Sequence, residues 1–592
     1  MTYRILTTIA LAIIIGCASV SNPMGGLKDE TPPQLVISTP LDQSIEYNQQ
    51  TVTLTFDEWI KADQLQKELL ITPLTEASYE YSQRKNQLTL TFKSQLTDST
   101  TYTLNFRNAI KDITESNIWQ NSSIAFSTGT FLDSMQINGT IQSLLTNEPS
   151  AEYLVGLYPS TIDTANLRQG KPLYLTSTDQ TGRYSITNVK SGQYLLYAFL
   201  DKNNNLINNS SSEAYAFHDK KINLIDSTVT IELKSYYRNE DTLKIKNSGP
   251  SGKDFKISIS KPLFDYNILA TEQPTKLIYS ALNEAREEIT IYKENFPSLS
   301  TDSIQTVITI TDSIGQIIKD TFYISFRESK IQNETLKVIS KPLTDIISGQ
   351  QQFQLLLNKP VQRVNYDSIY IGLNDSIILF PITEQQLSFN EHKNILTIST
   401  DLDKMVVDTL IAFHEKSIAE SHPDTLQTIQ DSLQSIQATK NSTLSVRLQP
   451  YLIIKKGTFT GIESDTLTSL KYSLQFMDIE DYGTIAGNVS DSTTNYIVQL
   501  VTDKYILTDS QQTKASYKFN YVKPGKYRIR VIRDSNNNKK WDSGNPLTLQ
   551  PSEEILHYNE LITVKANWEI LDINIQTTID LQSVDNKSDK YK

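Results

Sequence analysis

The sequence predicts an all-β protein built from β-sandwich domains in series, with one short helical insertion. Its composition favours strands, because Tyr (30) and Phe (19) far outnumber Met (5), and aromatic and β-branched side chains suit a pleated, half-buried surface. Short runs of alternating polar and apolar residues recur about every ten residues, a spacing typical of sandwiches. A chain of 592 residues exceeds one hydrophobic core, so roughly four or five domains are expected.

Charge and cysteine content exclude several classes of function. The net charge of −12, from 67 acidic and 55 basic residues, opposes a phosphate backbone, so nucleic acid is not an expected partner. The single cysteine excludes a disulfide framework and any multi-cysteine metal site. The position of that cysteine, close to the N-terminus, is the informative feature.

The N-terminal residues predict export and lipid attachment. Arg4 provides a short positive region, and Ile5–Ile15 form an apolar stretch too short to span a membrane. The tetrad Ile-Ile-Gly-Cys that ends at Cys17 resembles a bacterial lipobox. The resemblance implies a lipoprotein signal peptide at 1–16, cleavage before Cys17, a lipid on its sulfur and an acylated N-terminus. The alternatives are a membrane anchor and an ordinary signal peptide.

The expected location follows from that resemblance. A lipid-anchored protein of the cell envelope is expected, on the outer membrane, with the membrane as its partner through the anchor. Residues 18–22 contain no acidic run of the kind associated with export to the surface, so the periplasmic face and the surface face both stay open.

Residues 17–33 are interpreted as a lipid-anchored tether, because they hold Ser, Asn, Pro and Gly-Gly without an apolar period. Its distinctive positions are Cys17, Pro23, Gly25, Gly26, Lys28, Asp29, Pro32 and Pro33. This pattern resembles the entry segment of lipoproteins from Bacteroidetes-type bacteria, which continue into an Ig-like domain of the bacterial S-layer (SbsA) type. The run FDEWI at 56–60 is typical of that domain, which is therefore expected over 34–130.

An internal repeat organises much of the remaining chain. Residues 184–201 align without gaps to residues 517–534, and each stretch is followed by an Asn-rich turn. The strands that precede the two stretches both read Gly-Thr-Ile, at 139–141 and 483–485. The pattern resembles the prealbumin-like or collagen-adhesin B-type sandwich. It implies two copies of one module, over 131–236 and 481–576.

Two further domains are expected between these copies. Residues 331–480 echo the first domain weakly and indicate a divergent Ig-like domain, and residues 237–330 are strand-rich enough for another β-sandwich. Within the divergent domain, residues 423–438 are predicted to form a short helix, with apolar residues at helical spacing: Leu426, Ile429, Leu433 and Ile436. Its stripe is expected to pack on the neighbouring sheet, the alternative being a partner-binding helix. Residues 577–592 form a polar tail.

The best candidate for a bound ion is the Asn-rich loop of the second copy, which resembles a calcium loop. Side-chain oxygens at positions 1, 3, 5 and 9 and a main-chain carbonyl at position 7 match the ligands that Ca²⁺ prefers. These residues are Asp534, Asn536, Asn538, Asp542 and Lys540. Lys539 replaces the turn glycine and Asn545 replaces the last glutamate, so Glu553 or Glu554 would have to supply that carboxylate. The alternative is a turn held by side chain–backbone hydrogen bonds.

The equivalent loop of the first copy matches calcium less well. Asp201, Asn203 and Asn205 occupy its first three ligand positions, but Asn209 replaces the acidic residue and Glu213 falls one place late. No motif in the chain requires a cofactor, and a structural calcium ion is the candidate that the sequence offers.

No catalytic constellation is evident, so the chain is not expected to be an enzyme. The histidines are scattered, without metal-ligand spacing. Asp57 and Glu58 are interpreted as the solvent-facing edge of a strand rather than an acid/base pair. Repeated Asp-Ser/Thr pairs, which begin at Asp312 and Asp465 among others, look like O-glycosylation sites of Bacteroidetes-type proteins; the alternative is that they make turns before strands.

The expected function is that of a membrane-anchored envelope lipoprotein acting as a non-enzymatic structural or binding scaffold. The alternative is an outward-facing adhesin or carbohydrate-binding accessory protein with calcium-stiffened modules, which an exposed aromatic platform on a sandwich would favour. An envelope protein or a glycan is the expected partner in either case. A hydrolase is a third hypothesis, and it needs a buried carboxylate pair in a deep cleft.

Overall fold

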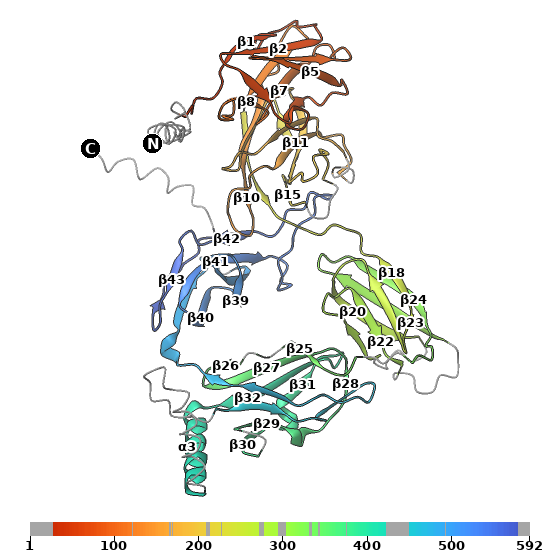
Figure 1. Ribbon diagram of the computed structural model, residues 1–592, viewed down its shortest axis with the longest axis vertical. Helices are drawn as coiled ribbons and strands as arrows, with labels where there is room; N and C mark the ends of the chain where they lie inside the picture. The colour runs from red at the N-terminus through yellow and green to blue at the C-terminus, as the bar shows by residue number, and fades with distance from the viewer. Residues whose placement is uncertain are drawn as a thin grey trace, which may run out of the picture. The chain divides into compact units, whose positions relative to one another are not determined.

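The computed structural model describes residues 28–577 except 121, 165–166, 168–169, 209–212, 226–227, 272–277, 294–302, 331–333, 341, 343, 374–375, 422–448 and 492. Cys17 and the helix predicted at 423–438 therefore lie outside the described residues. The described chain consists mostly of β-strands in many sheets, which confirms the predicted class of serial β-sandwiches (Figure 1). It divides into two compact units, Met1–Tyr237 with Gly544–Pro551, and Arg238–Ser543 with Ser552–Lys592.

The first domain is a sandwich whose core follows from strict alternation along its strands. Its elements are β1 (Leu35–Thr39), β2 (Thr51–Phe56), β3 (Ile60–Ala62), α2 (Leu65–Glu68), β4 (Leu70–Thr72), β5 (Tyr79–Arg84), β6 (Gln87–Phe92), β7 (Thr101–Asn105), β8 (Ile110–Asp112) and β9 (Ser123–Ser127). One sheet has the order β1-β2-β6-β5, a second has β4-β7-β9, and β3 pairs with β8. On β2, Val52, Leu54 and Phe56 are buried while the threonines between them are half-buried, as the period of two requires.

The first module follows in the same unit. Its strands are β10 (Met135–Ser143), β11 (Leu154–Pro159), β12 (Tyr174–Ser177), β13 (Arg183–Val189), β14 (Gly192–Phe199), β15 (Tyr215–Phe217), β16 (Ile222–Leu224) and β17 (Thr228–Ser235). They form the sheets β13-β10-β17 and β12-β11-β14-β15, with β16 paired to β14. The pairing of β10 with β17 is parallel, and the other pairings are antiparallel.

The second module repeats this topology strand for strand. Its strands are β37 (Gly483–Asn488), β38 (Asn495–Thr502), β39 (Leu507–Thr513), β40 (Ser516–Val522), β41 (Gly525–Asp534), β42 (Ile555–His557), β43 (Ile562–Val564) and β44 (Glu569–Ile570). The sheets are β40-β37-β44 and β39-β38-β41-β42, with β43 paired to β41. Again the pairing of the opening strand with the last one, β44, is parallel.

Register corrects the predicted alignment of the two opening strands. Gly139 lies opposite Tyr184 in the first copy, and Gly487, not Gly483, lies opposite the equivalent Tyr517 in the second. The physical requirement is close approach, because a Cβ added to Gly139 or Gly487 would meet a carbonyl oxygen of the parallel strand segment at 1.8 Å. The Gly-Thr-Ile sequence at 483–485 is therefore not structurally equivalent to that at 139–141, because Gly487, four residues after Gly483, is the counterpart of Gly139.

The third domain is another two-sheet sandwich. Its strands are β18 (Ile245–Ser251), β19 (Asp254–Ile259), β20 (Leu263–Ala270), β21 (Ser280–Leu282), β22 (Glu288–Ile291), β23 (Ile304–Asp312) and β24 (Ile317–Ile324). The sheets have the orders β18-β19-β22-β21 and β20-β23-β24. Isoleucines at alternate positions of β19, β22 and β23 fill the space between them.

The fourth domain repeats the first sheet order of the first domain. Its elements are β25 (Val338–Ser340), β26 (Asp345–Ile346), β27 (Gly349–Leu357), β28 (Val361–Val364), η3 (Tyr366–Ser368), β29 (Ile369–Gly372), β30 (Ile378–Pro381), η4 (Glu384–Gln386), β31 (Leu387–Phe389), β32 (Ile395–Leu402), α3 (Lys404–Ser421), β33 (Tyr451–Ile454), β34 (Phe459–Gly461), β35 (Leu470–Ser473), β36 (Gln475–Phe476) and η5 (Ile479–Asp481). Its sheet β25-β27-β32-β31 corresponds to β1-β2-β6-β5. The remaining sheets are β30-β29-β33-β35, β28-β34 and β26-β36.

Helix α3 is an element that the sequence analysis did not predict. Asp403 caps it, since its carboxylate accepts the backbone N–H of Met405 at 2.8 Å. Val407 and Ile411 are buried against the sheet that contains β30. The helix was not predicted because exposed apolar residues on its other faces, such as Phe413, hide the helical spacing of its buried residues in the sequence. No helix among the described residues is long and apolar enough to cross a membrane.

Candidate functional site

The Asn-rich loop of the second module begins at Asp534, the last residue of β41. Asp534 is buried, and its two carboxylate oxygens accept the backbone N–H groups of Asn538 at 3.0 Å and Lys539 at 2.9 Å. Lys539 adopts a φ of 66°, so it occupies the left-handed conformation that the expected glycine would have supplied. The first carboxylate of the candidate calcium loop therefore organises the turn behind it.

Glu553 supplies a carboxylate to this loop from the segment before β42. It accepts the N–H of Ser535 at 2.7 Å and that of Asp542 at 3.1 Å. Burial raises its pKa, and the nearby charges of Asp542 and Asp534 raise it further. Glu554, the other residue considered for this role, instead lies 3.4 Å from the guanidinium of Arg533.

Side-chain amides complete the arrangement. The amide nitrogens of Asn536 and Asn538 donate to the same oxygen of Asp542, at 2.6 and 2.8 Å. The loop thus gathers Asp534, Asn536, Asn538, Asp542 and Glu553 around one turn. Exchanging the nearly indistinguishable O and N of the two amides would make this set all-oxygen, which is the chemistry that Ca²⁺ prefers.

The same contacts also fit the simpler interpretation of the loop. Within the described part of the chain, no group of three or more His, Cys, Asp or Glu side chains has an arrangement that could hold a metal ion. Each carboxylate named above is engaged with an N–H group, as in a turn held by side chain–backbone bonds. A cation would therefore have to displace the amide N–H groups from Asp542. Lys540, the fifth candidate, places its ammonium group 3.4 Å from the centre of the Phe264 ring.

The loop of the first module has the same backbone bonds, atom for atom. Asp201 accepts the N–H groups of Asn205 at 3.2 Å and Leu206 at 3.0 Å, and Asn203 accepts that of Asn205 at 3.1 Å. The buried Glu213 accepts the N–H of Lys202 at 3.3 Å, as Glu553 does for Ser535. Its position one place late in the sequence therefore does not matter, because it reaches the loop from the segment just before β15. Asn209 lies outside the described residues.

The remaining sequence candidates are not brought together. Asp57 accepts the N–H of Gln34 at 2.8 Å and serves the entry of the chain into the first domain. His218 and His392 have pKa values lowered by burial, and the ring of His392 stacks on Tyr266 at 4.4 Å. Among the described residues, these histidines occupy separate sandwiches and form no site.

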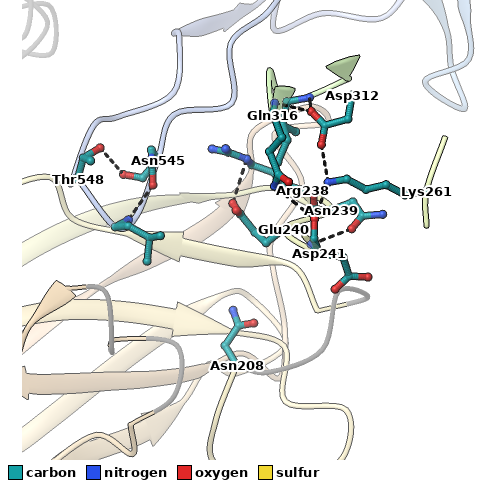
Figure 2. A network of polar contacts seen from close by, with 12 residues as sticks. Asn208, Arg238, Asn239, Glu240, Asp241, Lys261, Asp312, Gln316, Asn545 and Thr548 are labelled. Carbon is teal, nitrogen blue, oxygen red and sulfur yellow. Dashed lines mark hydrogen bonds and ion pairs between the residues drawn. The ribbon is translucent and has the colours of Figure 1, made fainter. Parts of the chain in front are cut away.

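A buried ion pair that the sequence did not reveal holds the chain segment leading into the third domain. The Lys261 ammonium group lies 2.5 Å from Asp312, and both side chains are buried. Figure 2 shows the Lys261 side chain directed at the Asp312 carboxylate. The same ammonium group donates to the carbonyl of Asp241 at 2.6 Å, and Gln316 accepts the N–H of Leu243 at 2.8 Å. The network therefore fixes residues 239–243 onto the third sandwich.

Two of the Asp-Ser/Thr pairs have structural roles for their aspartates. Asp312 belongs to the network just described, and Asp465 lies 3.2 Å from the buried ammonium group of Lys359. The hydroxyl-bearing residues that follow them, Ser313 and Thr466, are exposed. The first position combines a buried acid with an accessible hydroxyl, and the second combines a half-buried acid with one.

Comparisons with known proteins identify one domain. Residues 29–128 match the model of the family described as bacterial Ig-like domain. No curated protein matches the chain. An Ig-like domain is a module of structure or binding, and the match covers this one domain of the chain.

Solved structures similar to this chain include three multidomain proteins. The S-layer protein rSbsC is 11% identical, over 86% of this chain and 66% of its own, with a TM-score of 0.15. The major pilin subunit BcpA of Bacillus cereus is 9% identical, over 75% of this chain and 99% of its own, with a TM-score of 0.14. The Bacteroides ovatus protein SGBP-B, solved with a mixed-linkage heptasaccharide, is 10% identical, over 72% and 93%, with a TM-score of 0.15. This chain thus spans just under two thirds of the S-layer protein, and likeness at such TM-scores carries no functional argument.

Proposed function

We propose that this protein is a lipid-anchored lipoprotein of the cell envelope, on the outer membrane, whose β-sandwiches serve as a non-enzymatic structural or binding scaffold. The observation that carries the proposal is the position of Cys17, the one cysteine of the chain, directly after an apolar stretch of signal-peptide length. A polar tether separates it from β1, which begins at Leu35. Lipid on Cys17 together with an acylated N-terminus exceeds the two-chain threshold for stable anchoring.

The scaffold role is supported by where the buried polar groups go. Asp112 accepts the backbone N–H groups of Glu115 and Ser116, at 2.8 and 2.7 Å, and closes a turn. Asp312 and Lys261 fix a linker, and Asp534 organises a loop. These buried charges are thus used to hold backbone in place, as expected of a structural module.

Anchoring is tested by replacing the one cysteine. Cys17→Ser removes the thiol that carries the lipid, so the variant should leave the membrane fraction while the parent protein stays in it until detergent is added. Ala18→Ser is the matched control, because it changes the neighbouring residue and keeps the thiol. A Cys17→Ser protein that remained in the membrane fraction after a high-salt wash would overturn the anchor.

A second candidate function, an adhesin or carbohydrate-binding accessory protein, is favoured by the second module. Tyr521 and Trp568 are 45% and 49% exposed. Tyr521 lies in β40 and Trp568 directly precedes β44, and these two strands pair with β37 on either side. Tyr521 has a φ of 57°, a costly conformation for a bulky residue that frequently marks function. Exposed rings of this kind can stack on sugar rings, and a calcium-bound loop at 534–553 would stiffen the same module.

This candidate is tested by retention on insoluble polysaccharides. The full chain is passed over cellulose and over chitin, and a Tyr521→Ala/Trp568→Ala variant is compared with the parent. Loss of retention in the variant supports glycan binding. Tyr323→Ala is the control, because it removes an exposed ring outside the second module. Equal retention of the parent and the double variant, or of this control and the double variant, would contradict a role for Tyr521 and Trp568.

A further inference from the structure

The sixth position of the Asn-rich loop differs between the two modules in a way that calcium binding does not explain. Leu206 and Lys539 have nearly the same backbone conformation, with φ values of 62° and 66°. Glycine or asparagine adopts this left-handed conformation at lower cost than a bulky side chain. Lys539 points its side chain into solvent, but Leu206 is half-buried. A leucine in this conformation requires a favourable interaction of its side chain that offsets the backbone strain.

That partner belongs to the first domain. Leu206 lines a groove of about 300 Å³ together with residues on and beside β4 and with Leu175 of β12. The apolar residues of the opposite wall are Leu69, Leu70, Ile71, Leu74 and Tyr79. The loop of the first module therefore faces an apolar surface of the preceding domain inside the same compact unit.

Polar interactions join the first domain and the first module beside this groove. The N–H of Leu74 donates to the carbonyl of Leu173 at 2.7 Å, which joins the two domains through their backbones. Arg107 donates to the carbonyl of Glu68 at 2.7 Å, and burial lowers its pKa while the charges of Glu68 and Asp201 oppose that shift. Asp201 is the first residue of the loop, so a cationic side chain already faces the position where a calcium ion would need that carboxylate.

A second left-handed position, Asn188 with a φ of 56°, also differs between the two modules. Asn188 accepts a hydrogen bond from the Thr103 hydroxyl of the first domain at 3.4 Å and donates to the carbonyl of Asp133 at 3.1 Å. Its equivalent in the second module is Tyr521, which packs edge-on against Tyr482 at 6.4 Å. Leu206 and Asn188, two of the left-handed positions of the first module, thus both face the domain that precedes it.

We propose that the loop at residues 201–208 is an interdomain clasp that locks the Ig-like domain and the first module into one rigid body. The repeated loop has then been put to two uses. In the first module Leu206 and Asp201 engage the preceding domain, and in the second module the loop stays available to a cation. The mechanical consequence is a rigid two-domain base over residues 28–237, directly after the tether.

The test measures the distance between the two sandwiches in the full chain. Spin labels are placed on cysteines introduced at the exposed positions Glu80 and Glu232, in a Cys17→Ser background that leaves no other thiol. A rigid joint gives one narrow distance distribution in pulsed electron spin resonance. Leu206→Asn keeps a residue that tolerates the left-handed conformation but removes the apolar contact, so the narrow peak should be lost.

Controls separate the clasp from general damage to the module. Lys539→Asn makes the same change at the equivalent position of the second module and should leave the narrow peak intact. Leu206→Gly removes the strain along with the side chain, so it cannot act through misfolding of the loop, and it should also lose the peak. A narrow peak retained in Leu206→Asn and Leu206→Gly would overturn the clasp.

Discussion

At the scale of single residues, each module is stabilised by one buried tyrosine hydrogen bond. The sequence repeat identified the tyrosine of each bond but not its acceptor. The hydroxyls of Tyr184 and Tyr517 donate to the carbonyls of Ile231 and Ile573, at 2.7 and 2.6 Å, and burial raises both phenol pKa values. The sequence aligned the two tyrosines with each other. It could not assign their acceptors, because those lie 47 and 56 residues away and become neighbours only through the parallel pairing of the last strand.

Tyr517→Phe should destabilise the second module by about 1–3 kcal/mol, because the carbonyl of Ile573 would be left buried without a donor. The measurement is hydrogen exchange of the β37 amides as a function of urea. Tyr521→Phe is the matched control, since that ring is exposed. An equal effect of the two substitutions would show that the Tyr517 hydroxyl contributes nothing.

Lys261→Met should cost about 3–5 kcal/mol in the third domain, because Asp312 would remain buried without its counter-charge. The double variant Lys261→Met/Asp312→Leu should recover part of that loss. The readout is the rate of trypsin cleavage at Lys244, which directly follows the segment that the network holds and donates its N–H to the Ser260 hydroxyl. If the single and the double variant were cleaved equally fast, the ion pair would not be what holds this segment.

At the scale of elements, sequence patterns predicted strands well and short helices poorly. Period-two alternation identified β2, β6 and β7 because one face of each is buried. Helix α3 escaped because both of its faces carry apolar residues, and the helix predicted at 423–438 lies outside the described residues. The two Asn-rich loops were found from spacing, which also offered Glu553 or Glu554 for one loop and Glu213 for the other. The coordinates were needed to choose Glu553 over Glu554 and to bring Glu213 to its loop.

Calcium is predicted to stabilise the second module through the loop at 534–553. At a hundredfold excess over its dissociation constant it should add about 2.7 kcal/mol. Asp534→Ala should abolish that gain, and Asp201→Ala at the equivalent position of the first module should leave it unchanged. Titration calorimetry and thermal unfolding with and without chelator provide the measurements, and a gain that survived Asp534→Ala would place the ion elsewhere.

The same loop should lose affinity for calcium as the pH falls. Burial and neighbouring carboxylates raise the pKa of Glu553, so its neutral form is favoured in the folded protein without the ion. In the absence of calcium, this term stabilises the fold below the ordinary glutamate pKa and is lost as the pH rises through the raised value. A cation needs the charged form, so protons compete with it. Calcium affinity that stayed constant from pH 7 to pH 4.5 would exclude Glu553 as a ligand.

At the scale of the whole molecule, length and repeats were enough to predict sandwiches in series. The class follows from composition and period, both of which act locally. The joint between the first domain and the first module could not be predicted, because Leu206 reads as an ordinary loop residue until β4 is placed opposite it. The biological role depends on the N-terminal segment, where a single thiol decides whether the sandwiches are tied to a membrane.

Mass spectrometry of the N-terminal peptide of the purified protein shows whether Cys17 carries the lipid. We expect a peptide that begins at Cys17 and carries a thioether-linked diacylglycerol together with an amide-linked acyl chain. A peptide that begins upstream of residue 17, or an unmodified Cys17 thiol in protein taken from its native envelope, would contradict it.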